Sequence, residues 1–244
     1  MSRPISRFLN WLGRLFTGNS GVKKSKIRLL AVGMSNSRKF GVCPGAGIDA
    51  QRIYGRVSAG KKVLLLDSQA TTSSVLTALK DGIAQTADDG LFVFYYSGHG
   101  GQVKSSDPSE TDRKDETLCL WNGELVDNKI WSVLQTAKCR VFMVTDCCNS
   151  GTNFRAVMPF RSFIGARSIG SPRGLRLLHW GGCDDGKYSY GDDAGGIMTN
   201  AILSVIGDGL SYRKAFKKVS SASYKFQVPM RSNLGFDEDV EFMR

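Results

Sequence analysis

The chain has 244 residues, of which 41% are hydrophobic, and this size and composition suit one α/β domain or two small ones. No apolar run approaches the ~20 residues of a membrane span. The six cysteines form no CxxC pair, which favours a reduced, cytoplasmic setting over a secreted disulfide scaffold. The net charge is +11, but residues 1–48 hold nine Lys or Arg and no acid, so we expect a basic arm rather than a specific nucleic-acid-binding protein.

Residues 1–26 form the expected arm. Arginines interrupt its apolar residues, so we expect no signal peptide. Within residues 1–20, helical spacing predicts a short amphipathic basic helix from Phe8, Leu9, Leu12, Leu15 and Phe16. Three roles suit this helix: packing on its own domain, attachment to a membrane surface, and service as a removable pro-segment or transit peptide.

Strands and helices are expected to alternate after the arm. In chain order, we predict a strand at 27–34, a helix at 48–58, a strand at 61–67, a helix at 71–85, a strand at 91–98, a polar loop at 100–115, a helix at 127–134, strands at 139–147 and 175–182, and helices at 195–207 and 211–225. Near-continuous apolar strands alternating with helices indicate a mostly parallel sheet with helices on both faces. We therefore predict one α/β domain over residues 27–244.

Chemically active side chains follow two of these strands. His99 follows the third strand within YYSGHGG, and Cys147 and Cys148 end the fourth within TDCCNSG. Because the carboxyl ends of strands in an open α/β sheet meet at one edge, the imidazole and a thiol can lie together there. A histidine promotes the nucleophilic thiolate and can then protonate a leaving amine. The other histidine, His179, lies inside an apolar strand, where we expect a packed or hydrogen-bonded role.

YYSGHGG followed 49 residues later by DCCNSG resembles the caspase-like cysteine peptidases (clan CD, family C14), and metacaspases in particular. The resemblance extends from residue 27 to residue 242 and includes CPGAGIDA, KDETL, the glycine-rich segment 181–203 and FQVP. It implies a three-layer sandwich around a mostly parallel, six-stranded sheet. It also implies that His99 and Cys148 are catalytic and that Cys147 occupies a variable slot before the nucleophile.

The same resemblance implies a cysteine endopeptidase that cleaves protein or peptide substrates after Arg or Lys. Asp49, Ser97 and Asp146 match the residues that line the family's pocket for a basic side chain. Two carboxylates in a partly desolvated pocket repel each other unless a cation joins them, which agrees with a basic ligand. We further predict that the backbone N–H groups of Gly100 and Cys148 hold the developing oxyanion.

No cofactor is expected. The family's calcium-dependent members use several aspartates in the second half of the sheet, and this chain offers Asp112, Asp115 and Asp127 there. Asn128 and Arg155, however, occupy places where an acid is common. Because calcium needs six or more oxygen ligands, these departures argue against dependence on it.

Other functions compete with a peptidase. GAGIDA scans as a dinucleotide fingerprint but does not directly follow a strand, and a zinc site from the cysteines and His99 fits no standard spacing. The serious alternative is a catalytically silent caspase-like module whose basic arm binds a membrane or nucleic acid. The presence of both His99 and Cys148 argues against it. We expect a monomer, which is common among metacaspase-like chains.

An acid-free segment with four arginines, residues 155–174, separates the fourth and fifth predicted strands. We expect it to be a surface loop. Caspase relatives are cut at this position during activation, so self-cleavage here, or in the Lys-rich connector at 23–26, is a further hypothesis.

Overall fold

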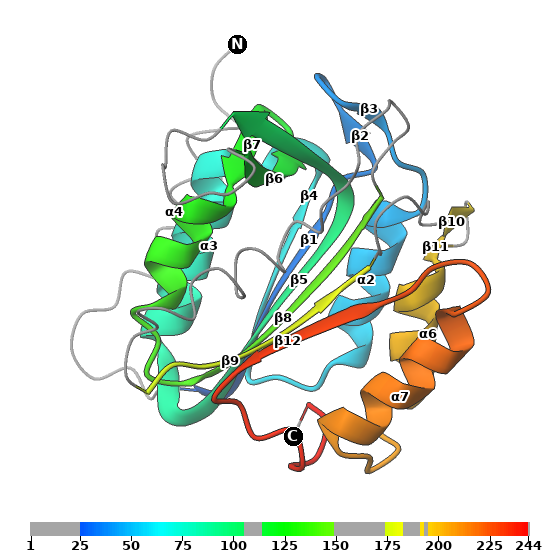
Figure 1. Ribbon diagram of the computed structural model, residues 1–244. Coiled ribbons are helices and arrows are strands. Elements are labelled where there is room, and N and C mark those ends of the chain that lie inside the picture. Colours follow the sequence, from blue (N-terminus) through cyan, green and yellow to red (C-terminus); the bar gives the residue numbers. More distant parts are fainter. Residues whose placement is uncertain (1–24, 105–113, 149–173, 183–190, 193–194, 244) are drawn as a thin grey trace.

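The computed structural model describes residues 25–104, 114–148, 174–182, 191–192 and 195–243. The central sheet of the described residues has eight strands, and six of them lie side by side in the order β12-β9-β8-β5-β1-β4 (Figure 1). These strands are β1 (Ser25–Gly33), β4 (Lys61–Leu66), β5 (Thr86–Lys104), β8 (Arg140–Cys148), β9 (Arg176–Gly181) and β12 (Met230–Leu234). The first five pair in parallel and β12 pairs antiparallel with β9, so the expected mostly parallel arrangement of six strands is confirmed, and two further strands extend the sheet.

Helices cover both faces of this sheet (Figure 1). One face carries α2 (Ala46–Arg56), α6 (Ile197–Val205) and α7 (Tyr212–Ser223), and the other carries α3 (Thr72–Ala84) and α4 (Asp127–Leu134). Each lies within two residues of the start and end that its sequence pattern predicts. The α3 helix begins where its pattern indicates because the Thr71 side chain accepts the Ser74 N–H at 3.1 Å. The three-layer α/β sandwich is therefore confirmed.

Two apolar cores lie on the two faces of the sheet, and β5 contributes to both. Phe94 and Tyr96 pack on the α3 and α4 side, whereas Val93 and Tyr95 pack on the α2, α6 and α7 side. Successive side chains of a strand point to opposite faces, so a strand buried on both sides has an unbroken apolar sequence. This is why the predicted strands lack the alternation of a half-exposed sheet.

The predicted loop at 100–115 is wrong at both of its ends. β5 continues to Lys104 and pairs antiparallel with β6 (Lys114–Leu120), from Gly100 opposite Leu118 to Lys104 opposite Lys114. β6 in turn pairs with β7 (Gly123–Val126). This pairing gives backbone groups hydrogen-bonding partners from a segment distant in sequence, which local composition does not reveal. His99 therefore lies inside a long strand and not just beyond the end of one.

Three short elements lie beside the main sheet. The hairpin of β2 (Asn36–Ser37) and β3 (Gly41–Val42) precedes α2, and the two-residue strands β10 (Gly191–Asp192) and β11 (Gly195–Gly196) precede α6. A 3-10 turn, η1 (Asp67–Gln69), follows β4. None of the helices in the described ranges has the length and apolar composition that a membrane-spanning helix needs.

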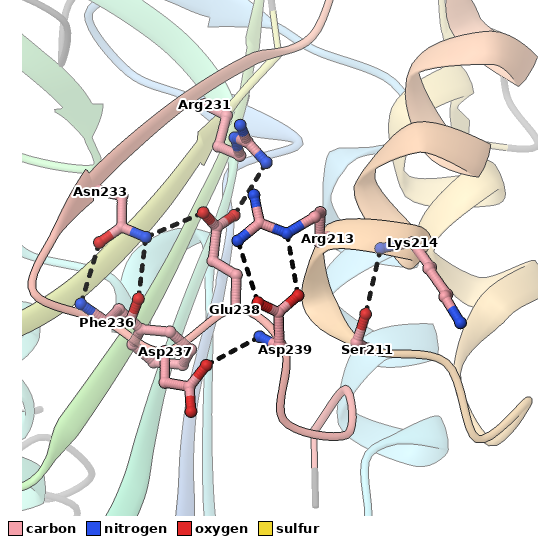
Figure 2. A network of polar contacts seen from close by, with 9 residues as sticks. All are labelled: Ser211, Arg213, Lys214, Arg231, Asn233, Phe236, Asp237, Glu238 and Asp239. Carbon is pink, nitrogen blue, oxygen red and sulfur yellow. Dashed lines mark hydrogen bonds and ion pairs between the residues drawn. The ribbon is translucent and has the colours of Figure 1, made fainter.

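Charged side chains fasten the C-terminal segment to α7 and to the edge strand β12 (Figure 2). Arg213 donates to both carboxylate oxygens of Asp239, at 2.9 and 3.2 Å. Glu238 is only 6% exposed and accepts from Arg231 at 3.0 Å and from Asn233 at 2.9 Å. The buried Glu238 carboxylate thereby ties the end of the chain to the edge of the sheet.

Candidate active site

The carboxyl ends of β5 and β8 bring the predicted site residues into register. Ser97 pairs with Asp146, and His99 pairs with Cys148 at the last step of the parallel ladder. A cavity of about 190 Å³ opens at this edge and is lined by the side chains of Asp49, Ser97, His99 and Asp146 together with residues 42–46 and 195–196. Four residues predicted from distant parts of the sequence thus face one space. For Cys148 the structure describes the backbone pairing.

One nitrogen of the His99 ring contacts a backbone carbonyl, and the other is the nitrogen that could accept a proton. Nε2 lies 3.2 Å from the carbonyl oxygen of Val42 in β3. Because a carbonyl can only accept, Nε2 carries the hydrogen, and Nδ1 of the neutral ring carries a lone pair. Nδ1 is buried and has no hydrogen-bonding partner among the described residues. The Tyr96 hydroxyl fixes the backbone beneath the ring, 2.7 Å from the His99 carbonyl and 2.9 Å from that of Cys119.

The Asp49 carboxylate, in the first turn of α2, is almost completely buried and only half satisfied. Oδ2 accepts the Gly196 N–H at 2.7 Å and faces the Ser97 hydroxyl at 3.5 Å. Oδ1 makes no hydrogen bond among the described residues and lies 3.9 Å from Arg52 Nη1. The pKa of Asp49 is raised to about 7: burial is the main cause and the charge of Asp146 adds to it, while Gly196, Arg52 and Ser97 act in the opposite direction. A cation in the cavity would therefore favour its ionised form.

Asp146, on β8, lines the same cavity and also caps α6. Its Oδ2 accepts from the backbone N–H of Thr199 at 3.1 Å and from the Thr199 hydroxyl at 2.6 Å. The Tyr95 hydroxyl lies 2.6 Å from the Thr199 hydroxyl. A carboxylate only accepts, so Thr199 donates to Asp146 and Tyr95 donates to Thr199. The N-terminus of α6 thus binds Asp146 with donors that favour its charged form.

Two glycines let the start of α6 approach the carboxylates. A Cβ atom on Gly195 would lie 2.2 Å from Asp49 Oδ1, and one on Gly196 would lie 2.7 Å from Asp146 Oδ2. Gly195 also has a φ of +111°, which side chains disfavour. Sequence reasoning assigned no role to these glycines, to Thr199 or to Val42. For the glycines and Thr199, the signal available in the sequence was their position within the glycine-rich segment 181–203.

The remaining predicted residues separate into those that pack and those outside the described ranges. Cys147 is 8% exposed and belongs to the core on the α3 and α4 side. His179 is buried beside the Thr145 hydroxyl at 2.9 Å, and burial lowers its pKa to about 3, which confirms its expected packed role. Gly100 lies in β5 opposite β6. Cys183, the arm at 1–24 and most of the segment at 155–174 lie outside the described residues.

The candidate calcium ligands belong to no group of three His, Cys, Asp or Glu side chains that could hold a metal ion within the described residues. Asp115 accepts from the Asn128 side-chain amide at 2.8 Å, and Asp127 accepts the Asn128 N–H at 2.7 Å. The hydrogen-bond donors of Asn128 thus contact the carboxylates of Asp115 and Asp127, which a cation would need as ligands. Asp112 and Arg155 lie outside the described residues.

Comparison with known proteins agrees with this geometry. Residues 57–156 match the family model described as "Metacaspase, peptidase C14 domain". The expected resemblance of this chain to metacaspases of peptidase family C14 is confirmed, and C14 is a family of cysteine peptidases.

Individual relatives show how far the similarity extends. Metacaspase-1 of Schizosaccharomyces pombe is 26% identical over 60% of this chain and 37% of its own length. Metacaspase-1 of Yarrowia lipolytica is 30% identical over 62% of this chain and 36% of its own length. The chain thus spans little more than a third of these curated relatives. A solved structure from Geobacter sulfurreducens superposes with a TM-score of 0.69 at 25% identity, covering 87% of this chain and 94% of that one.

Proposed function

We propose that this protein is a cysteine endopeptidase that cleaves peptide bonds after arginine or lysine. The observation that carries the proposal is one cavity lined by His99, Asp49 and Asp146, at the strand ends where His99 pairs with Cys148. In addition, Nδ1 of His99 has no hydrogen-bonding partner among the described residues. Similarity to a family of cysteine peptidases supports the same reaction.

In the proposed reaction, Cys148 transfers its thiol proton to Nδ1 of His99 and its sulfur attacks the scissile carbonyl. The imidazolium so formed donates through Nε2 to the Val42 carbonyl, 3.2 Å away, which stabilises its charge. The backbone N–H groups of Gly100 and Cys148 are the proposed oxyanion donors. When the C–N bond breaks, Nδ1 returns the proton to the leaving amine, and water then hydrolyses the thioester and restores the thiol.

The identity of the nucleophile follows from the alternation of side chains along β8. Cys147 is packed in the core on the α3 and α4 side, whereas Asp146 faces the cavity on the other side of the sheet. A strand has a period of two residues, so position 148 belongs to the same face as Asp146. This supports Cys148, rather than its neighbour, as the attacking residue.

The charge of the cavity supports specificity for a basic side chain. Its described lining contains the carboxylates of Asp49 and Asp146 and no lysine or arginine. An aspartate-cleaving pocket would need cationic side chains there. The guanidinium of arginine can bind a carboxylate in a bidentate fork, and the ammonium of lysine can approach it as a point charge.

Fluorogenic peptides with Arg, Lys or Asp before the scissile bond test this function. We expect cleavage after Arg and Lys, its loss in Cys148→Ala and in His99→Ala, and retention of most activity in Cys147→Ala. An affinity label for active-site thiols should mark Cys148 in the wild-type protein. Efficient cleavage after Asp, or no labelling at Cys148, would overturn the proposal, and the second result would favour a catalytically silent module.

A further inference from the structure

Arg52 lies close to Asp49 but outside the lining of the proposed specificity pocket. Arg52 lies one helical turn after Asp49 on α2, and its Nη1 is 3.9 Å from Asp49 Oδ1. The same Nη1 donates to Asn200 Oδ1 on α6 at 2.6 Å. Arg52 is not among the residues that line the cavity, and a Cβ on Gly195 would come within 3.1 Å of Nη1 and 2.2 Å of Asp49 Oδ1. Its charge therefore reaches Asp49 from outside the space that a substrate would enter.

We infer that Arg52 is a positioning residue for substrate specificity: held by Asn200 behind the pocket, its charge favours the ionised carboxylate of Asp49 without forming a hydrogen bond to it. The inference rests on the proposed function. A separation of 3.9 Å is too long for a hydrogen bond but short enough for Coulomb attraction, which solvent weakens because the Arg52 side chain is 41% exposed. Arg52 cannot close on Asp49 without stretching its 2.6 Å bond to Asn200.

The groups around Asp49 show why a nearby positive charge matters. Asp146 on β8 carries a like charge. On β5, the titratable groups near the cavity are the Tyr95 phenol and the His99 imidazole, and the start of α6 contributes the Gly196 N–H. Arg52 is the cation that the described residues bring to this carboxylate. Two carboxylates and one arginine leave one negative charge unbalanced, which a single substrate cation would neutralise.

Titration of Asp49 makes the role of Arg52 measurable. Burial raises the pKa of Asp49 to about 7, and the Arg52 charge acts in the opposite direction. Without that charge, Asp49 would hold its proton to a higher pH and would attract a basic side chain less at neutral pH. Above that range the carboxylate ionises without help, so the defect should disappear.

Two variants separate the charge of Arg52 from its tether. Arg52→Gln removes the charge but retains an amide donor, and it should raise KM for an arginine peptide about three- to tenfold below pH 7, with recovery above pH 8.5 and little change in kcat. Asn200→Ala retains the charge but removes the hydrogen bond that opposes approach of Arg52 to Oδ1, so KM should rise at every pH. Arg52→Lys should restore the wild-type pH profile in part.

Benzamidine binding measured by calorimetry on the Cys148→Ala protein, between pH 5.5 and 9, gives the same comparison without catalysis. Equal losses for Arg52→Gln at low and high pH, or a loss of kcat or Tm alone, would overturn the inference and leave arginine cleavage by the wild type intact. A wild-type protein that neither cleaves arginine peptides nor binds benzamidine would overturn the proposed function, and the inference with it.

Discussion

Replacing Asp49 with asparagine should stabilise the folded protein at alkaline pH, although the variant should lose arginine cleavage. Asp49 is 1% exposed, and burial raises its pKa from 3.8 to about 7. Between these values the folded state holds a proton that the unfolded state has released. The free energy of unfolding therefore falls as pH rises from about 4 to about 7, and then levels off. A shift of this size corresponds to about 4 kcal/mol at most.

Asparagine does not titrate, and its carbonyl oxygen can still accept the Gly196 N–H. Asp49→Asn should therefore match the wild type near pH 4.5 and exceed its Tm at pH 8.5 by an amount on the order of 5–15 °C. Thermal unfolding followed by circular dichroism, with both proteins in the Cys148→Ala background, measures this difference without proteolysis.

Asp239 provides the matched control, because its exposed carboxylate pairs with Arg213 and has a lowered pKa. A lowered pKa contributes stability above the unfolded value, so Asp239→Asn should gain none at pH 8.5. A gain for Asp49→Asn that is the same at every pH, or a loss at pH 8.5, would refute the reasoning.

Three further results are expected. Glu238→Ala removes the buried carboxylate to which Arg231 and Asn233 donate, and it should lower the free energy of unfolding by about 2 kcal/mol, measured in urea. We expect kcat/KM at 20 °C to be unchanged, and a large loss of kcat/KM would contradict a purely structural role. Tyr96→Phe removes the hydroxyl that holds the His99 carbonyl, so kcat should fall roughly tenfold at constant KM, whereas an effect on KM alone would argue against this role. Removing calcium with a chelator should change kcat/KM of the wild type by no more than about twofold, because the Asn128 amide already donates to the Asp115 carboxylate. If activity is lost and added calcium restores it, ligands outside the described residues complete a calcium site.

Local sequence patterns were sufficient to predict the layers of the fold. The apolar runs at 27–34, 61–67 and 139–147 agree with β1, β4 and β8 to within two residues at each end. Burial on both faces demands such runs, and helical periodicity with a Thr71 cap marks α3 just as directly. The motifs around His99 and Cys148 likewise pointed to one edge of the sheet, because parallel strands end together.

The contacts that prepare the cavity come from segments far apart in the chain, and only the tertiary structure decided them. The Val42 carbonyl selects the tautomer of His99, and the start of α6 supplies the Gly196 N–H to Asp49 and Thr199 to Asp146. A backbone carbonyl or N–H has the same chemistry at every residue, so the residue type does not indicate that its backbone will bind a site side chain.

Pairing between distant strands escaped prediction for the same reason. β5 continues through residues 100–104 because their backbone pairs with β6. Neither segment has an apolar pattern from which this pairing could be predicted. The balance at Asp49 has a similar origin. A carboxylate in the first turn of a helix normally ionises readily. Here burial and the charge of Asp146 raise its pKa, while Gly196 and Arg52 oppose that rise. These partners meet only when α2, β8 and α6 pack together.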